Sequence, residues 1–445
     1  MKEKHEAGLS IWQLSMMAVG SVIGASFFLG SSVAIHSAGP SIIISYILGG
    51  ALVYYILFAL SEMTVNDPGA GSFQVFAQRA YGQMAGFVTG WVYWTGIVLA
   101  MSSEATAISI LVKNWFPDVS TLLLGSIIII GVTSVNLLGA DRLSKLESIL
   151  AAVKLITIAA FIVIGVLLIL GVIKGNHTGS SIRYSRPAFF TEPFFTNGLK
   201  GFLGSLLLVI YSYSGFEVLG LAAAEARDPR KTVPKAIHIV VAILLTLYII
   251  SVGVILFLIP TDEIAGDSSP MVAALGRYGF GWIGNILNVV LITAILSTML
   301  ASMFGVGRMI RTLASKRFAP AFLDEKTEVP YREIIFSGCA MLLALFAAVL
   351  MPEVYLFLVS AGGFSSIFVY IMIMASHIRF RGKHGKPDDK LRLEGFPYSS
   401  LFVLICLIAA VVFMPFVKGQ TAGLVAGVII IVFYCVIFIF AVDKS

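Results

Sequence analysis

The chain has 445 residues, of which 58% are hydrophobic and 12% are charged, and its formal net charge is +6. Soluble globular proteins carry about 25% charged residues, so this composition excludes an ordinary water-soluble fold and indicates burial in a lipid bilayer. The basic residues lie in short loops between apolar segments, which is typical of membrane proteins and gives no indication of nucleic-acid binding. The apolar segments are continuous and close to the ~20 residues that cross a bilayer as a helix, which favours an all-α integral membrane protein over a barrel.

The apolar segments predict twelve transmembrane helices. In chain order we expect them at residues 11–37, 41–62, 82–112, 121–138, 147–173, 197–223, 235–259, 282–312, 333–351, 354–377, 399–417 and 421–441. An even number of crossings places both termini on one side, and most of the 30 lysines and arginines lie in loops on that side. The positive-inside rule then predicts a multi-pass protein of the cell (plasma) membrane with both termini cytoplasmic. Residues 66–81 are expected to form a turn and a short amphipathic helix on the inner interface.

Two of these helices contain glycine among small polar residues near their middle. The first contains the segment from Gly20 to Ser26 (GSVIGAS), and the sixth contains the segment from Tyr211 to Glu217 (YSYSGFE). Glycine costs about 1 kcal/mol relative to alanine inside a helix, and nearby serines can satisfy backbone groups where a helix unwinds. We therefore predict that helices 1 and 6 are discontinuous. The alternative is that these glycines only permit close helix packing.

The two interrupted helices begin two blocks of five helices, residues 11–173 and 197–377, and residues 399–441 add helices 11 and 12. An odd number of crossings per block gives the blocks opposite orientations, which predicts a five-plus-five inverted repeat within one transmembrane domain, residues 1–445. Interrupted helices at matching positions of two halves point to the binding site of a transporter. Free N–H groups of a half-helix suit a carboxylate and free carbonyls suit an ammonium, so such a site can bind both ends of an α-amino acid.

The sequence resembles the amino acid–polyamine–organocation (APC) superfamily, and within it the bacterial amino-acid transporter branch, whose members are amino-acid permeases. The resemblance is carried by GSVIGASFF in the first helix, by YSYSGFE in the sixth and by the loop EARDPRKTVPKAI at residues 225–237. It extends from Gly8 to about Pro330. It implies a leucine-transporter-like fold with twelve helices, and it implies secondary transport of amino acids.

The resemblance also implies which residues contact the substrate. Peptide groups of the first interrupted helix are expected to hold its carboxylate: Ser21, Ile23, Gly24, Ala25 and Ser26. Carbonyls of the sixth helix are expected to hold its amino group: Tyr211, Ser212, Ser214 and Gly215. Tyr211 takes the place of an aromatic outer lid, and further pocket positions fall on Tyr93, Glu104 and Ala301. The family commonly has glycine where this chain has Ser26, whose side chain would narrow the carboxylate end or add a hydroxyl donor.

Three ionisable residues lie inside predicted helices: Glu104, Lys154 and Glu217. A charged side chain at mid-bilayer costs at least about 2.5–3.5 kcal/mol on insertion scales, so each is a functional candidate. Lys154 is predicted to carry the coupled proton, because a lysine in apolar surroundings can bind and release one near neutral pH. Its expected neighbours are carbonyls of helix 1 and the hydroxyls of Ser297 or Thr298. The alternative is that Lys154 extends to the inner interface.

Glu104 and Glu217 are predicted to differ in role. Glu104 is either a pocket carboxylate, which contacts the substrate or titrates, or a polar contact between helices. Glu217 follows the break in helix 6 and is expected to accept hydrogen bonds from the N–H groups exposed there. Gly20 is expected to support the break in helix 1.

These residues predict a secondary active transporter that takes up an amino acid, with a lean to a neutral one, by proton symport through alternating access. The alternatives are an amino-acid/amine exchanger or a membrane sensor that binds amino acids without moving them. An intramembrane enzyme would need paired catalytic groups, which the predicted helix interiors lack, so no catalytic residue, metal site or cofactor is predicted. The expected partners are the amino acid, the proton and the lipid bilayer, and not a nucleic acid.

Overall fold

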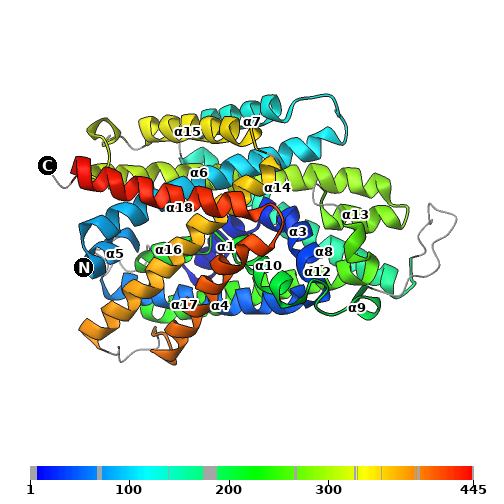
Figure 1. Cartoon of the computed structure of the whole chain (residues 1–445), viewed down its shortest axis with the longest axis horizontal. Coiled ribbons are helices and arrows are strands. Elements are labelled where there is room, and N and C mark those ends of the chain that lie inside the picture. Colours follow the sequence, from blue (N-terminus) through cyan, green and yellow to red (C-terminus); the bar gives the residue numbers. More distant parts are fainter. Residues whose placement is uncertain are drawn as a thin grey trace.

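The computed structural model describes residues 8–442 apart from 68–72, 139, 174–187, 265–267, 325–326, 328, 352, 386 and 388–390. Regular structure in the described residues is helical, except for one isolated bridge between Leu9 and Ala226. Most helices run along the long axis of the molecule (Figure 1). Helix α5 (Phe73–Tyr81) and the end of α18 (Gln420–Ile437) lie at one end, and α9 (Ala188–Thr191) and α13 (Pro270–Arg277) lie at the other (Figure 1).

Long apolar helices account for most of the chain. They are α4 (Ile42–Asn66), α6 (Gln83–Lys113), α7 (Thr121–Asn136), α8 (Ala140–Ile169), α12 (Pro229–Leu258), α14 (Gly281–Ser315), α15 (Tyr331–Val349), α16 (Val354–His384), α17 (Tyr398–Phe413) and α18. Within the described residues, nine helical segments are long and apolar enough to cross a membrane, or ten if one bent pair counts as a single span. The all-helical membrane fold is thus confirmed, while twelve crossings and the inverted repeat stay predictions.

The two helices predicted to be discontinuous are both interrupted. The first consists of α1 (Ile11–Val22), α2 (Ala25–Phe28) and α3 (Gly30–Ala38). The sixth consists of α10 (Gly198–Ser212) and α11 (Glu217–Leu221), and the chain bends by 51° at the break. Helix α1 begins with a capping box in which the side chains of Ser10 and Gln13 each accept the other residue's backbone N–H.

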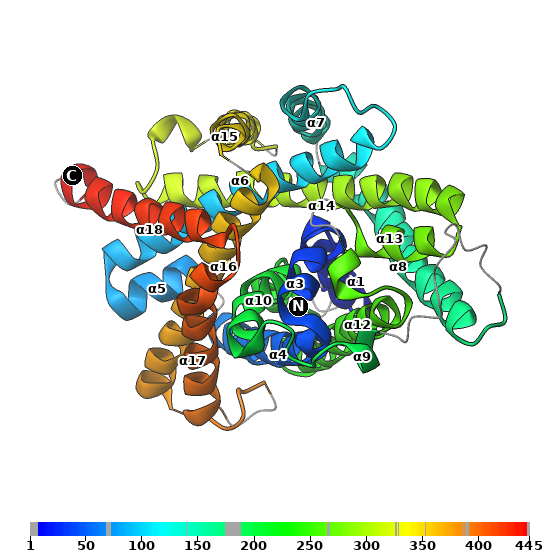
Figure 2. The same cartoon turned by 45° about the vertical axis from the view of Figure 1, so that its right-hand side comes forward.

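The helices pack in two groups (Figure 2). The first group consists of α1, α3, α4, α10 and α12, which pack against one another. The second consists of α6, α7, α14 and α15, and Figure 2 shows α7 and α15 side by side with the first group gathered on the other side of α14. Helix α16 packs most closely on α6 and also contacts α10 and α4, so it borders both groups.

Helix α5 is the short amphipathic helix expected within residues 66–81. Its residues from Phe73 to Ala77 are buried, and it packs on α6 and α16. Phe73, Phe76 and Ala77 lie three and four residues apart and therefore share one face of the helix. That apolar face is covered by neighbouring helices while Arg79 and Tyr81 are exposed, and the position of α5 on the inner membrane interface stays a prediction.

The outward faces of the peripheral helices are apolar. Large hydrophobic side chains are exposed on α8, α15, α17 and α18, among them Ile156, Leu343, Ile405 and Ile429. Soluble proteins rarely expose contiguous apolar surface of this kind, and a lipid bilayer covers it.

A buried ion cluster joins α4 to α16 and to the segment before α17. Glu62 is fully buried and accepts hydrogen bonds from Arg381 Nη2 at 2.9 Å and from the Leu393 N–H at 2.7 Å. Its other oxygen, Oε1, pairs with Arg381 Nε and lies 3.3 Å from His377 Nε2. Arg381 Nη2 also donates to the Leu393 carbonyl at 3.1 Å. Oε2 of Glu62 therefore accepts two hydrogen bonds, whereas Oε1 has ion-pair contacts without a hydrogen bond, and the buried charge is compensated by the Arg381 guanidinium.

Candidate functional site

The first helix break consists of two residues in extended conformation between α1 and α2. Ile23 (φ −75°, ψ 103°) and Gly24 (φ −142°, ψ −161°) are extended. The Gly24 carbonyl then accepts the N–H groups of Phe27 and Phe28 at 3.1 and 3.2 Å, which begins α2. The first N–H groups of a helix have no partner within it, so the amides that follow Gly24 can bind an anion, and that of Ala25 hydrogen-bonds to the carboxylate of Glu104 on α6.

The second helix break lies at Tyr213–Phe216, between α10 and α11. Gly215 has φ +105°, a conformation that other residues rarely adopt, and a Cβ added there would lie 2.6 Å from the Ser21 carbonyl oxygen. The position therefore requires glycine for two separate reasons, its own backbone conformation and the close approach of helix 1.

The two breaks are in direct contact. Ser21 Oγ lies 3.0 Å from the Gly215 carbonyl oxygen and 2.9 Å from that of Ala18. The hydroxyl thus links the end of α1 to the break in helix 6. Segments almost 200 residues apart in the sequence thus meet at the two breaks inside the helix bundle.

Glu217 stabilises the second break. The side chain is 4% exposed, and its Oε2 accepts the Gly215 N–H at 3.0 Å and the Tyr370 hydroxyl at 3.2 Å. Its Oε1 lies 3.4 Å from the hydroxyl of Tyr93. Tyr370 also reaches Ser214 Oγ at 3.2 Å. The predicted contact between Glu217 and the exposed backbone is present.

Tyrosine hydroxyls satisfy further backbone carbonyls at the breaks, which the sequence reasoning missed. Tyr248 donates to the Ser212 carbonyl at 2.8 Å, and Tyr355 donates to the Ala25 carbonyl at 3.0 Å. The Ser212 carbonyl was expected to hold the substrate amino group, and it retains a second lone pair for that purpose. A tyrosine inside an apolar helix needs a hydrogen-bond partner, and this was the available signal.

Lys154 lies on α8 against the end of α1. Its side chain is 1% exposed, and Nζ donates to the Gly20 carbonyl at 2.7 Å. The expected neighbour among helix-1 carbonyls is therefore present, and the alternative of an ammonium extending to the membrane interface is wrong. Ser297 Oγ is buried without a hydrogen-bond partner. The Thr298 hydroxyl donates to Glu104.

Glu104 on α6 lies directly beside the first break. Its Oε1 accepts the Thr298 hydroxyl at 3.0 Å, while its buried Oε2 has no hydrogen-bond partner. A Cβ added to Gly24 would lie 2.6 Å from Oε1, so the carboxylate fills the space that the missing side chain leaves. Glu104 also interacts electrostatically with Lys154. A carboxylate of the protein thus occupies the region where the substrate carboxylate is expected.

The other predicted pocket residues do not all meet at this point. Tyr93 and Glu104 are separated by about 16 Å along α6, given the helical rise per residue, and the Tyr93 ring packs against Phe73. Tyr211 is 5% exposed, and its hydroxyl would lie 3.1 Å from a Cβ at Gly362 of α16. Ser26 and Ala301 are half-buried. Substrate contacts for these residues stay predictions.

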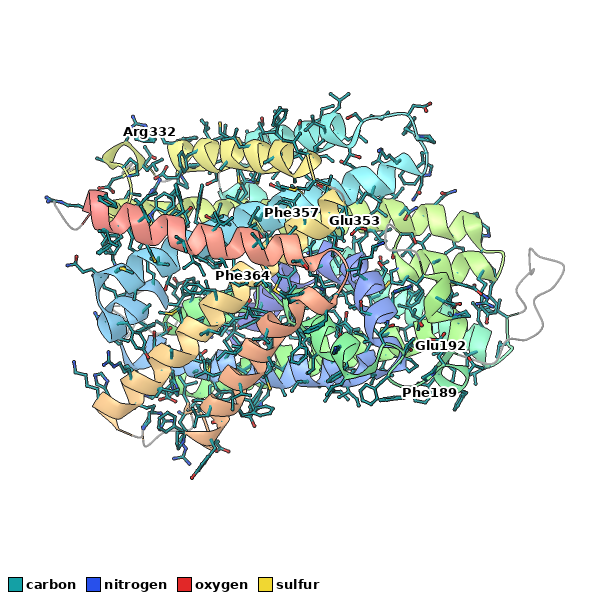
Figure 3. All side chains as sticks on the ribbon, viewed as in Figure 1. Phe189, Glu192, Arg332, Glu353, Phe357 and Phe364 are labelled. Atoms are coloured by element: carbon teal, nitrogen blue, oxygen red, sulfur yellow. The ribbon has the colours of Figure 1, made fainter. Side chains whose placement is uncertain are left out.

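A cavity of about 700 Å³ leads toward the first break. Its lining comes from the ends of several helices and includes Val33, His36, Thr106, Asp262, Glu353 and Tyr355. Figure 3 shows Glu353 and Phe357 at the beginning of α16 and Phe364 further along that helix, beside α18. Tyr355 both lines the cavity and donates to the Ala25 carbonyl, so it connects this cavity to the break.

Two adjoining helix breaks inside an apolar helical bundle are the architecture of a polytopic membrane transport protein. The model of a family described as "Amino acid permease" matches residues 13–444. The chain is 33% identical over 435 residues to the uncharacterized amino acid permease YtnA of Bacillus subtilis, which covers 96% of this chain and 93% of that protein. It belongs to the amino acid permease family of the APC superfamily.

Relatives with assigned names are also similar along nearly their whole length. The gamma-aminobutyric acid permease of B. subtilis is 31% identical over 433 residues, covering 94% of this chain and 91% of that protein. The aromatic amino acid transport protein AroP of Escherichia coli is 30% identical over 423 residues, covering 94% and 92%. Family membership implies amino-acid transport and a multi-pass position in the plasma membrane, and the relatives carry the names of transporters rather than enzymes.

Proposed function

We propose that this chain takes up an amino acid by proton symport, through alternating access around the two helix breaks. The observation that carries the proposal is the hydrogen bond from Lys154 Nζ to the Gly20 carbonyl. It connects a buried ionisable group directly to the half-helix whose end forms the substrate site. A change in the protonation of Lys154 would therefore alter the position of α1 at the break.

Peptide groups at the two breaks would bind the substrate backbone. The carboxylate would accept N–H groups that follow Gly24, and the ammonium would donate to carbonyls of the second break, including that of Ser212. Ser21 would hold the two halves of the site at a fixed spacing, because it bridges them at 3.0 Å. Peptide dipoles bind both charges without placing an unpaired side-chain charge in the membrane.

Glu104 would make binding sensitive to protons. Its carboxylate lies beside Gly24, so an incoming substrate carboxylate would meet a like charge there. Two adjacent carboxylates disfavour each other's ionised form, which means that substrate binding would favour entry of a proton into the cluster. Lys154, Glu104, Thr298 and the unpartnered Ser297 hydroxyl would together form the coupling group.

Transport would proceed by movement of one helix group against the other. The Glu62–Arg381 pair joins α4 to α16 away from the breaks. The first group carries both breaks, where hydrogen bonds from Lys154 on α8, from Tyr93 on α6 and from Tyr355 and Tyr370 on α16 join it to other helices. These hydrogen bonds would change partners between the outward-open and inward-open states. The five-plus-five inverted repeat and cytoplasmic termini belong to the same proposal.

The test is uptake of radiolabelled amino acids into proteoliposomes, with and without an imposed pH gradient. We expect accumulation of one or a few neutral amino acids above equilibrium when the outside is acidic, and little accumulation when the gradient is collapsed by an ionophore. Uptake that requires amino acid or amine preloaded inside, and ignores the gradient, identifies an exchanger instead. Binding without uptake under either condition identifies a sensor.

We favour a neutral amino acid as the substrate because of the residues around the breaks. Apart from Glu104, the expected pocket residues are small or aromatic, so no fixed positive or negative partner for a substrate side chain is evident. The relatives are named for different substrates, gamma-aminobutyric acid and aromatic amino acids. Both fall within a panel of neutral amino acids, which makes that panel the first to measure.

A further inference from the structure

A second cavity, of about 330 Å³, lies among three helices at the end of the molecule that holds α5. It is lined by residues from the end of α4, from α5 and from α16: Met63, Asp67, Phe76, Arg79, Ala80, Ser376, Arg379, Phe380, Lys383 and His384. None of them belongs to the two helix breaks. The cavity is therefore separate from the proposed substrate path.

The lining of the cavity has a basic part and an apolar part. Arg79, Arg379 and Lys383 face a single acid, Asp67, so the formal charge is +2 before His384 is counted. The α16 residues Ser376, Arg379, Phe380, Lys383 and His384 follow the spacing of one helix face and extend over about 12 Å of helix axis. A ligand along this face would meet charged groups near His384 and an apolar wall around Met63, Phe76 and Phe380.

The arginine side chains in the lining have partners that fix their positions and still have N–H donors for a ligand. Arg79 pairs with Asp67, and Arg379 donates to the Ala80 carbonyl while its guanidinium stacks 5.0 Å from the centre of the Tyr81 ring. A guanidinium has five N–H donors, so most of them remain for a ligand. Within the described residues Lys383 has no ion-pair partner. The Ser376 hydroxyl lines the cavity, is 1% exposed and has no hydrogen-bond partner.

From this arrangement we infer that the cavity binds the phosphate group of an anionic phospholipid. Fixed guanidinium groups, a free ammonium and an unpartnered buried hydroxyl match the acceptor oxygens of a phosphate. Basic pockets between helices at the cytoplasmic face are a known setting for anionic head groups. The apolar wall distinguishes a lipid from free phosphate, because only the lipid has glycerol and acyl carbons to place against Phe76 and Phe380.

Occupancy of the cavity would affect transport, because it connects parts that the proposed cycle moves. Helix α4 belongs to the helix group that contains the breaks, whereas α5 and α16 pack on α6 of the other group. A head group bound by α4, α5 and α16 at once would favour the arrangement described here over one in which α4 has moved. This consequence rests on the proposed transport cycle, whereas the binding itself rests on the lining of the cavity and on the predicted cytoplasmic position of this end of the molecule.

Native mass spectrometry of the purified protein tests the binding. The samples contain equal amounts of phosphatidylglycerol or phosphatidylcholine, or inorganic phosphate alone. We expect retention of phosphatidylglycerol over phosphatidylcholine, and Lys383→Gln should weaken it about fivefold, the effect of one basic residue near an anionic surface. Lys235→Gln removes the same charge at the start of α12, outside the cavity, and should leave retention unchanged.

Three results would overturn the inference. Equal losses in Lys383→Gln and Lys235→Gln would show attraction by diffuse surface charge. Equal retention of the two lipids would show that the head-group charge is not recognised. Inorganic phosphate that binds alone and displaces the lipid at low millimolar concentration would identify a soluble anion as the ligand. Each variant is first shown to match the wild type in melting temperature, and none of these readouts depends on whether the protein transports an amino acid.

Discussion

Two buried carboxylates in this protein have very different surroundings. Glu62 pairs with the Arg381 guanidinium and accepts the Leu393 N–H, although its Oε1 has ion-pair contacts and no hydrogen bond. Glu104 accepts hydrogen bonds from the Thr298 hydroxyl and from the backbone of Ala25, and its Oε2 has none. A buried carboxylate paired with a guanidinium stabilises one arrangement, whereas one held by neutral donors can exchange partners at lower cost. The comparison separates a structural cluster from a site that can change state, and burial alone would not have done so.

The largest effect is expected at the structural cluster. Glu62→Ala leaves Arg381 buried without its anion and should lower the free energy of unfolding by about 3–5 kcal/mol. The measurement is the fraction of monodisperse protein and its melting temperature in detergent. Lys231→Ala is the control, because it breaks an exposed pair with Asp228 and should cost at most about 1 kcal/mol. Equal stability of the two variants would show that the Glu62 cluster contributes no more to stability than the ion pair that the control breaks.

The next largest effect is on coupling. Lys154→Gln and Lys154→Ala remove the ionisable group that contacts the Gly20 carbonyl, and each should reduce pH-driven accumulation at least tenfold. Exchange of internal for external substrate should persist, because the peptide groups of the site are unchanged. Uptake in proteoliposomes with and without a pH gradient measures both activities, and Lys113→Gln at the end of α6 is the control. Full pH-dependent accumulation in both Lys154 variants would refute the coupling role.

A smaller effect is expected when the space beside Glu104 is filled. Gly24→Ala places a methyl group 2.6 Å from Glu104 Oε1, which a flexible side chain can vacate without unfolding the protein. We expect near-normal stability and about tenfold weaker substrate binding, measured by isothermal titration or by ligand-induced thermal shift. Gly253→Ala on α12 is the control, since its added methyl group meets nothing within 4 Å. Binding unchanged in Gly24→Ala would place the substrate elsewhere.

The smallest change in stability is expected at Glu104 itself. Glu104→Gln keeps the size of the side chain and can keep the Thr298 contact, so stability should change by no more than about 1 kcal/mol. The pH dependence of uptake between about pH 5 and 8 should become flatter, because a titratable group is lost from the coupling cluster. If Glu104→Gln instead unfolds the protein as Glu62→Ala is expected to, the two carboxylates have the same role.

Local sequence features accounted for much of the fold. Continuous apolar segments predicted each long helix to within a few residues at most ends, because a helix in lipid must satisfy its own backbone and span a fixed thickness. Glycine with neighbouring serine predicted both breaks, and Glu217 was correctly expected to bond the backbone of the second. The partners of α5 were not predicted, because its apolar face is the same whether it faces lipid or other helices.

The partners of the buried polar groups could not be predicted in this way. The hydroxyls of Tyr248, Tyr355 and Tyr370 approach the breaks from helices distant in the sequence, and nothing local marks where such a hydroxyl points. The position of Glu104 against Gly24 likewise depends on how α6 crosses α2.

The sequence by itself determined that this is a helical membrane protein of the amino-acid permease type, where its helices begin and end, and which two of them unwind. Those properties depend on hydropathy, glycine and the self-contained hydrogen bonding of helices, all of which are local. Only the tertiary structure decided that Ser21 meets Gly215, that Lys154 reaches Gly20, and that Glu62 pairs with a guanidinium while Glu104 accepts from a hydroxyl. Such contacts depend on the angles and offsets at which distant helices pack, and these are settled by the whole bundle at once.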